Sequence, residues 1–380
     1  MRVYLDNAAT TPVAPEVADI MAECIREDFG NPSSTHTFGR KSKGLIETSR
    51  RTIAKHLNCL PKEIIFTSGG TEADNMAILC AINDLKVERI ISSPIEHHAV
   101  SHTVEHHCAQ RNVELVMVRL DEKGHVDVSH LSELLAAGPK TLVSLMHANN
   151  EIGNLMDLRR IGEMCRESGA YFHSDTVQTM GHYAFDLKDL NVDFVTCAAH
   201  KFHGPKGVGF LYVNERIPFH AIIHGGAQER GLRGGTENLY GIVGLAKAMD
   251  LAYEDVEGHQ QHVQELKSYF ISELQNKLPD VGFHGDITPE KSLYTVLNVC
   301  FPPHEKSGVL LFTLDMRGVA CSGGSACSSG SNKGSHVLEG IHADMSRPNA
   351  RFSFSRYTTK EEIDFALEQI CAIYETEKVS

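Results

Sequence analysis

Long apolar runs are absent from this sequence, and none approaches the ~20 consecutive residues that a membrane-spanning helix needs. The first residues form neither an apolar export signal nor an arginine-rich transit peptide, so we expect a cytoplasmic protein without a membrane anchor. None of the ten cysteines form a Cys-x-x-Cys pair, which argues against a disulfide framework or a zinc knuckle and predicts a site without metal.

Basic residues are in deficit, because 36 Lys and Arg stand against 49 Asp and Glu and give a formal net charge of -13. This balance disfavours direct DNA binding or an anionic membrane surface, and it favours small molecules or basic protein patches as partners. Hydrophobic residues make up 42% of the 380 residues, which is enough for a sizeable core. The length fits one large domain plus a smaller one.

Short apolar, β-branched segments alternate with helical stretches in the first part of the chain, which predicts an α/β fold with a mainly parallel seven-stranded sheet. The expected strands are residues 63–68, 89–93, 114–120, 141–147, 170–175, 193–199 and 207–213. After about residue 240 the pattern changes to that of a smaller α+β domain. It has amphipathic helices over 239–277, a strand at 293–301, a helix at 305–316, a Gly/Ser-rich loop at 321–335, a strand at 351–355 and a helix from Thr359. We therefore expect a large domain of residues 14–250 and a small domain made of residues 1–13 with 251–380.

Chemically useful residues follow several of these strands, at the sheet edge where α/β proteins bind ligands. Gly69-Gly70-Thr71-Glu72 could cradle a phosphate with backbone N–H groups at a helix N-terminus. The segment is neither a dinucleotide fingerprint nor a Walker A loop, which disfavours dinucleotides and ATP. A tight turn with Thr71 as the helix cap explains the same residues equally well.

A lysine and a carboxylate also stand at strand ends. Asp175 ends one strand, with Gln178 three residues later, and Lys201 follows another strand in Ala-Ala-His-Lys. A lysine there can form a Schiff base with pyridoxal phosphate (PLP), while the aspartate keeps the pyridine nitrogen protonated. The alternative is a surface lysine and a capping aspartate. Lys206 is the rival lysine, but it lies inside a turn.

Two histidine patterns follow the strand at 89–93. His97 could stack on a cofactor ring and carry protons. His98, His102 and His106 would share one helical face that could bind zinc or nickel, although a solvated face is the commoner case.

The remaining candidates lie in loops and on the last strand. Asn150 could hydrogen-bond a cofactor or substrate, and the Gly-rich segment 224–236, ending at Thr236, could contact an anion or be a plain surface loop. Arg351 could grip a carboxylate bidentately. Cys327 lies in the Gly/Ser-rich loop and is expected to be exposed, whereas Cys321 is expected to be a core residue.

Taken together and in this order, these segments resemble the NifS/IscS-type cysteine desulfurases, which are class V aminotransferases of PLP fold type I. The likeness covers nearly the whole chain, in YLDNAATTP, GNPSSTHTFGR, FTSGGTEADN, EHHAV, HANNEIG, HSDTVQ, AAHKFHGPKGVG, ERGLRGGTEN, GSACSSGS and RFSFSR. It implies removal of sulfur from L-cysteine, giving L-alanine and a persulfide on Cys327. An iron–sulfur scaffold or a tRNA-thiolation protein would then accept the sulfur.

The resemblance also implies a role for each candidate. Lys201 becomes the Schiff-base lysine, Asp175 the partner of the pyridine nitrogen, His97 the ring-stacking acid/base, and Arg351 the holder of the substrate carboxylate. The other cofactor ligands would be Gly70, Thr71, Asn150, Gln178 and His200, with Thr236 reaching the phosphate of a neighbouring subunit in a homodimer. Ala198 departs from the family, which often has a phosphate-binding serine there. Three rival interpretations remain: an aminotransferase, a selenocysteine lyase, and a protein that binds PLP or metal without catalytic activity.

Overall fold

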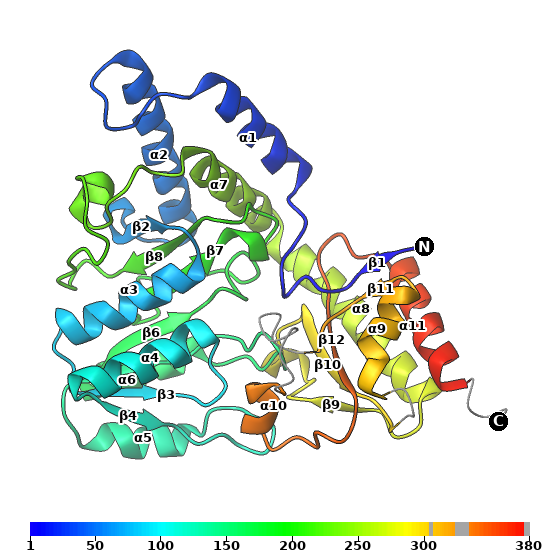
Figure 1. The fold of residues 1–380 in the computed structure, drawn as a ribbon. Coiled ribbons are helices and arrows are strands. Elements are labelled where there is room, and N and C mark those ends of the chain that lie inside the picture. The colour runs from blue at the N-terminus through cyan, green and yellow to red at the C-terminus, as the bar shows by residue number, and fades with distance from the viewer. Residues whose placement is uncertain (304–306, 324–333, 376–380) are drawn as a thin grey trace.

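The computed structural model describes residues 1–303, 307–323 and 334–375. Its largest element is a seven-stranded sheet in the order β2-β8-β7-β6-β5-β3-β4 (Figure 1). The strands are β2 (Ile64–Thr67), β3 (Arg89–Ser92), β4 (Glu114–Met117), β5 (Thr141–Ser144), β6 (Tyr171–Asp175), β7 (Phe194–Ala198) and β8 (Gly209–Val213). β8 runs antiparallel to both of its neighbours, and the strands from β7 to β4 are mutually parallel.

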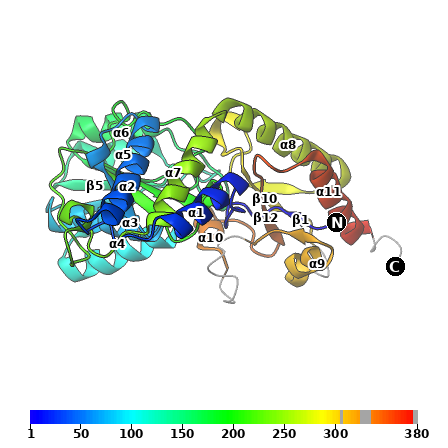
Figure 2. The same ribbon diagram turned by 90° about the horizontal axis from the view of Figure 1, so that it is seen from above.

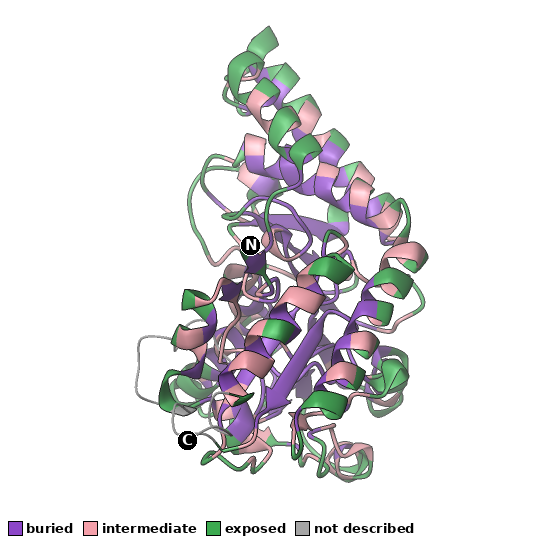
Figure 3. Ribbon diagram, turned by 90° about the vertical axis from the view of Figure 1, so that its right-hand side faces the viewer, coloured by how far each residue is buried: buried purple, intermediate pink, exposed green. Residues whose placement is uncertain are grey.

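Helices cover both faces of this sheet, which is why its strands are apolar almost throughout. Successive strand residues contribute to different cores, so that Ile90 packs with α3 (Gly70–Asn83) and α4 (His98–Arg111), while Ile91 belongs to the opposite core. That opposite core contains residues of α1 (Pro15–Glu27), α2 (Thr37–His56), α5 (Val128–Ala136), α6 (Leu158–Ser168) and α7 (Leu239–Tyr253). In Figure 3 most strands are accordingly buried, and surface helices have one buried and one exposed face. The edge strand β4 is the exception in this sheet, because none of its residues is buried.

A second core lies beside the first and is built around a small antiparallel sheet in the order β12-β10-β9 (Figure 2). Phe270, Phe301, Phe352 and Phe354 pack together in it, largely edge to face. Its elements are β9 (Gly282–His284), β10 (Val296–Cys300), β12 (Asn349–Ser353), α8 (Val256–Lys277), α9 (Leu310–Met316) and α11 (Lys360–Glu375). The short helix α10 (His336–Gly340) packs instead in a small separate cluster with Ile95 and Ile152. The start of the chain joins this part, because β1 (Val3–Tyr4) pairs in parallel with β11 (Val319–Ala320).

The predicted α/β class and the mainly parallel seven-stranded sheet are confirmed, and each predicted strand of that sheet contains one observed strand. The helix expected at 305–316 is only partly matched, since α9 begins at Leu310 after a short 3-10 turn. The two-residue strands β1 and β11 were not predicted. The domain boundaries at residues 13/14 and 250/251 stay a prediction.

Candidate active site

A cavity of about 250 Å³ opens at the carboxyl ends of the central strands. Nine of the eleven residues predicted for the site line it: Gly70, Thr71, His97, Asn150, Asp175, Gln178, His200, Lys201 and Arg351. Of the remaining two, Thr236 is exposed and does not line this cavity, and Cys327 lies outside the described residues. The rival Lys206 is exposed in its turn and does not line the cavity.

One end of the cavity is the N-terminus of α3. Gly69 is its N-cap with φ of 153°, and no side chain caps the helix, so the alternative that Thr71 is the cap is wrong. A Cβ atom at Gly70 would lie 2.8 Å from Val177 Cγ2, so only glycine fits between the helix and the β6 edge without displacement. An uncapped helix start with close backbone approach suits a bound anion.

Lys201 follows β7 on a short 3-10 turn (Ala199–Lys201) and points at the N-terminal segment. Its Nζ donates hydrogen bonds to the carbonyls of Ala8 at 2.7 Å and Ala9 at 2.8 Å. The side chain of Gln178 donates to the same Ala8 carbonyl, and His200 Nδ1 lies 3.1 Å from Thr10 Oγ1. The start of the sequence therefore forms one wall of the site, a role that sequence reasoning missed.

Asp175 ends β6 and shares the floor of the cavity with a second carboxylate, Asp74 of α3. Burial raises the pKa of Asp175 to about 7, and the nearby charge of Asp74 adds to the shift, whereas Lys201 opposes it. Burial likewise raises the pKa of Asp74 to about 7. Asp74 Oδ1 lies 3.4 Å from His173 Nε2 and has no hydrogen-bond partner among the described residues. Two buried carboxylates therefore face a space that would accept a cation or a protonated ring nitrogen.

His97 is the N-cap of α4, and its Nδ1 accepts a hydrogen bond from Ala99 N at 3.1 Å. That bond assigns the proton of the neutral ring to Nε2. Burial is the main cause that lowers the pKa of His97 to about 4, followed by the charge of Lys201 and then by the neighbouring histidines. His97 is therefore an uncharged imidazole at neutral pH in this protein. The neighbouring His98 and His102 rings stack 4.5 Å apart, and His106 pairs with His107 instead.

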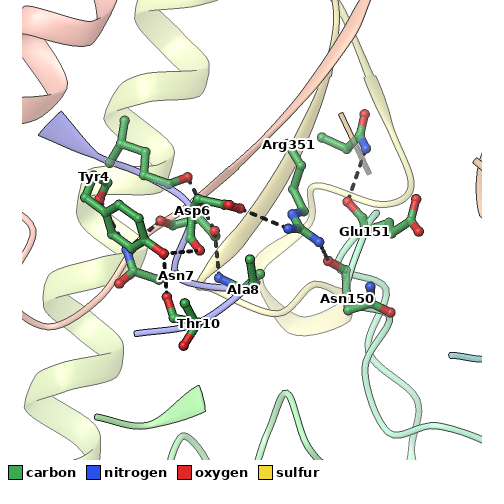
Figure 4. A network of polar contacts seen from close by, with 12 residues as sticks. Tyr4, Asp6, Asn7, Ala8, Thr10, Asn150, Glu151 and Arg351 are labelled. Atoms are coloured by element: carbon green, nitrogen blue, oxygen red, sulfur yellow. Dashed lines mark hydrogen bonds and ion pairs between the residues drawn. The ribbon is translucent and has the colours of Figure 1, made fainter. Parts of the chain in front are cut away.

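Arg351 of β12 lies between the N-terminal segment and the loop after β5 (Figure 4). Only 1% of it is exposed. Its Nη1 donates to Asn150 O at 2.8 Å and its Nη2 contacts Asp6 Oδ1 at 3.0 Å. Since Arg351 is at the cavity wall, it can reach a carboxylate that enters the cavity.

The Gly-rich segment 224–236 is fixed to the large sheet through the side chain of Glu229. Glu229 forms a bidentate pair with Arg50, in which both N···O distances are 2.8 Å, and it also accepts from Phe66 N. Glu229 and Arg230 both have positive φ, of 46° and 59°, so the pair holds a turn that non-glycine residues rarely adopt. Thr236 projects from this segment at the surface, and its predicted role in a neighbouring subunit stays a prediction.

The aminotransferase class-V family model matches residues 3–365. The chain belongs to this family. A cysteine desulfurase IscS from Dictyoglomus turgidum is 41% identical over 377 residues, which cover 98% of this chain and 94% of the relative. A solved NifS-like protein superposes with a TM-score of 0.91 at 35% identity, covering 99% of this chain and all of that one. The family resemblance predicted from the sequence is thereby confirmed.

A further solved structure, described as SspA in complex with cysteine, matches with a TM-score of 0.80 and 30% identity over 94% of this chain and 100% of that chain. In that protein the fold binds cysteine. Among the helices of the described residues, none combines the length and the apolar character needed to cross a bilayer.

Proposed function

We propose that the chain is a PLP-dependent cysteine desulfurase that converts L-cysteine into L-alanine and leaves the sulfur on Cys327. One observation carries the proposal: a single cavity of about 250 Å³ brings together the amine of Lys201, the carboxylate of Asp175 and the guanidinium of Arg351. These are the groups that a PLP enzyme needs to attach its cofactor, tune the ring and hold an amino-acid carboxylate. The relatives named cysteine desulfurase support the choice of substrate.

The cavity fits this cofactor in three respects. Lys201 supplies the amine for covalent attachment, and the buried carboxylates of Asp175 and Asp74 suit a protonated ring nitrogen. The uncapped start of α3 at Gly70 and Thr71, with His200 beside it, suits the phosphate. Gln178 and Asn150 would supply the side contacts. When bound, the cofactor supplies an electron sink for the substrate carbon that loses its proton.

The residues of the chain then divide the work. Arg351 binds the substrate carboxylate, and Lys201, held near the cavity by two backbone carbonyls, takes the proton from the substrate carbon. His97 offers an N–H at Nε2. To accept a thiol proton, it must first give up the Nδ1 bond to Ala99 N. Burial is the main cause of the low His97 pKa, and the Lys201 charge is the second.

Sulfur transfer needs a thiolate that attacks the substrate sulfur. The Cys327 S–S bond forms as the substrate C–S bond breaks, and the electron pair stays on the substrate carbon, which takes a proton to become alanine. Cys327 lies outside the described residues, but the chain on either side of residues 324–333 is anchored beside the cavity. Ser322 exchanges two backbone hydrogen bonds with Arg351, and Ser335 Oγ donates to Glu151 at 2.5 Å. An iron–sulfur scaffold or thiolation protein as acceptor, and a homodimer that shares Thr236, complete the proposal.

The test compares Cys327→Ser with Cys321→Ser. Cys321 is a matched control because it stands at the start of the same Gly/Ser-rich segment. Both variants should bind the cofactor and absorb at ~400 nm. Only Cys327→Ser should lose alanine release and the added sulfur that mass spectrometry finds on the Cys327 peptide of the wild type. Sulfur on another cysteine, or full activity in Cys327→Ser, would refute this role. Transamination products, or activity restricted to selenocysteine, would identify one of the rival enzymes.

A further inference from the structure

Arg351 is a buried cation, and among the described residues one negative group contacts it directly. Its Nη2 contacts Asp6 Oδ1 at 3.0 Å, its Nη1 is held by the Asn150 carbonyl, and its Nε has no hydrogen-bond partner among the described residues (Figure 4). A guanidinium that is 1% exposed is costly without a counter-charge. Asp6 is thus the group that neutralises Arg351 when no ligand is bound.

The other titratable groups near Arg351 do not share this task. Burial raises the pKa of Glu151, which is fully buried and bonded to Ser335. Burial also raises the pKa of Cys321 to about 12 and that of Tyr4 above its usual range, so both stay uncharged at neutral pH. Asp6 is therefore the one carboxylate in direct contact with the guanidinium among the described residues.

Asp6 is also the partner that can leave. The Asn150 contact comes from a backbone carbonyl, whereas the Asp6 side chain is 20% exposed and holds Arg351 through a single oxygen. The Asp6 backbone is fixed independently, because its carbonyl accepts from Ala9 N and from the Tyr4 hydroxyl. Rotation of the side chain would free Nη2 while the segment stays in position, and Nη2 with the unpartnered Nε would then present two donors to an incoming carboxylate.

We propose that Asp6 is an internal counter-ion that Arg351 exchanges for the substrate carboxylate, so that the site selects thiols carrying a carboxylate over their neutral analogues. This inference rests on the proposed function, since it assigns Arg351 to the substrate. A ligand with a carboxylate replaces the charge that Asp6 withdraws, and the buried guanidinium stays neutralised. A ligand with a neutral head group offers no such replacement, so Asp6 remains on Arg351 and the ligand gains nothing from the arginine.

The experiment uses Asp6→Asn, which keeps the shape and a hydrogen-bonding oxygen but removes the competing charge. The probes are 3-mercaptopropionate, which is cysteine without its amino group, and its neutral amide. Their dissociation constants are measured on the holoenzyme by calorimetry. Asp6→Asn should bind the acid about tenfold more tightly, because a charged partner of a guanidinium is exchanged for a neutral one. Binding of the amide should not change, and the KM for L-cysteine should fall in parallel.

Two controls keep the result specific. Asp189→Asn removes the same charge from an exposed aspartate paired with Arg159 at 2.7 Å, and it should leave both probes unaffected. In an Arg351→Gln background, Asp6→Asn should no longer alter affinity for the acid. If Asp6→Asn does not fold, Asp6→Ser carries the same expectation.

Unchanged or weaker binding of the acid by a folded Asp6 variant would overturn the inference and make Asp6 a structural brace. Failure of the proposed function gives a different result. In that case the wild type releases no alanine from L-cysteine, while the comparison of acid with amide still decides the role of Asp6.

Discussion

The buried pair between Arg50 and Glu229 offers the sharpest test of how the Gly-rich segment is held. Both side chains are 2% exposed, and Glu229 accepts from both Arg50 terminal nitrogens and from Phe66 N. Burial alone would lower the pKa of Arg50, but the hydrogen bonds and charge of Glu229 hold it above its usual range. Removing the charge in Glu229→Gln leaves Arg50 with one remaining carboxylate partner, the partly exposed Glu47 at 3.2 Å, and breaking a buried pair costs about 3–5 kcal/mol.

We therefore expect Glu229→Gln to lower the free energy of unfolding by ~3 kcal/mol. This value is at the lower end of the range because glutamine keeps one hydrogen-bond acceptor. Urea titration followed by circular dichroism measures this change. Glu215→Gln, which breaks an exposed pair with Lys62, is the matched control and should change stability little. Replacing both partners by methionine should restore much of the loss. If Glu229→Gln unfolds at the same urea concentration as the control, the pair does not hold the segment.

Two further predictions follow from buried titratable groups. Burial lowers the pKa of Lys267, which is bonded to Ser292 Oγ and Leu293 O, to about 7. The unfolded chain binds that proton up to pH ~10.4, so stability should rise between pH 7 and 9 by at most ~1.4 kcal/mol per unit, a slope that Lys267→Met should remove in urea titrations. His97 of the apo-protein should titrate near pH 4 in proton NMR, with its resonance assigned by its loss in His97→Gln; a midpoint close to 6.5 would contradict the burial argument.

Much of the site could be predicted because its residues stand at the ends of strands. A strand that is apolar on both faces can be recognised locally, and in a parallel sheet its carboxyl end faces the ligand edge. Lys201, Asp175 and His97 are each placed by this reasoning, and the cavity contains all three. The same argument separates Lys201 from Lys206, which is exposed and does not line the cavity.

The rest of the site depends on contacts that no local pattern encodes. Asp6 meets Arg351 across 345 residues of sequence, and nothing near Asp6 indicates an arginine partner. Asp74 sits one turn inside α3, where an acidic residue looks like part of a solvated helix face, yet it is 1% exposed beside the cavity. The strand β1 is two residues long and exists only because β11 pairs with it.

The position of the N-terminal wall has a consequence for synthesis on the ribosome. A nascent chain emerges in order, and its early part can fold before its end is made. The proposed cofactor ligands from Gly70 to Lys201 emerge long before Arg351. The strand of Arg351 also holds the N-terminal segment, because Ser353 N donates a hydrogen bond to the Leu5 carbonyl. A partly synthesised chain can therefore assemble the cofactor end of the cavity while the carboxylate end is missing. With the proposed role of Arg351, the order of translation delays cysteine binding until the chain is nearly finished.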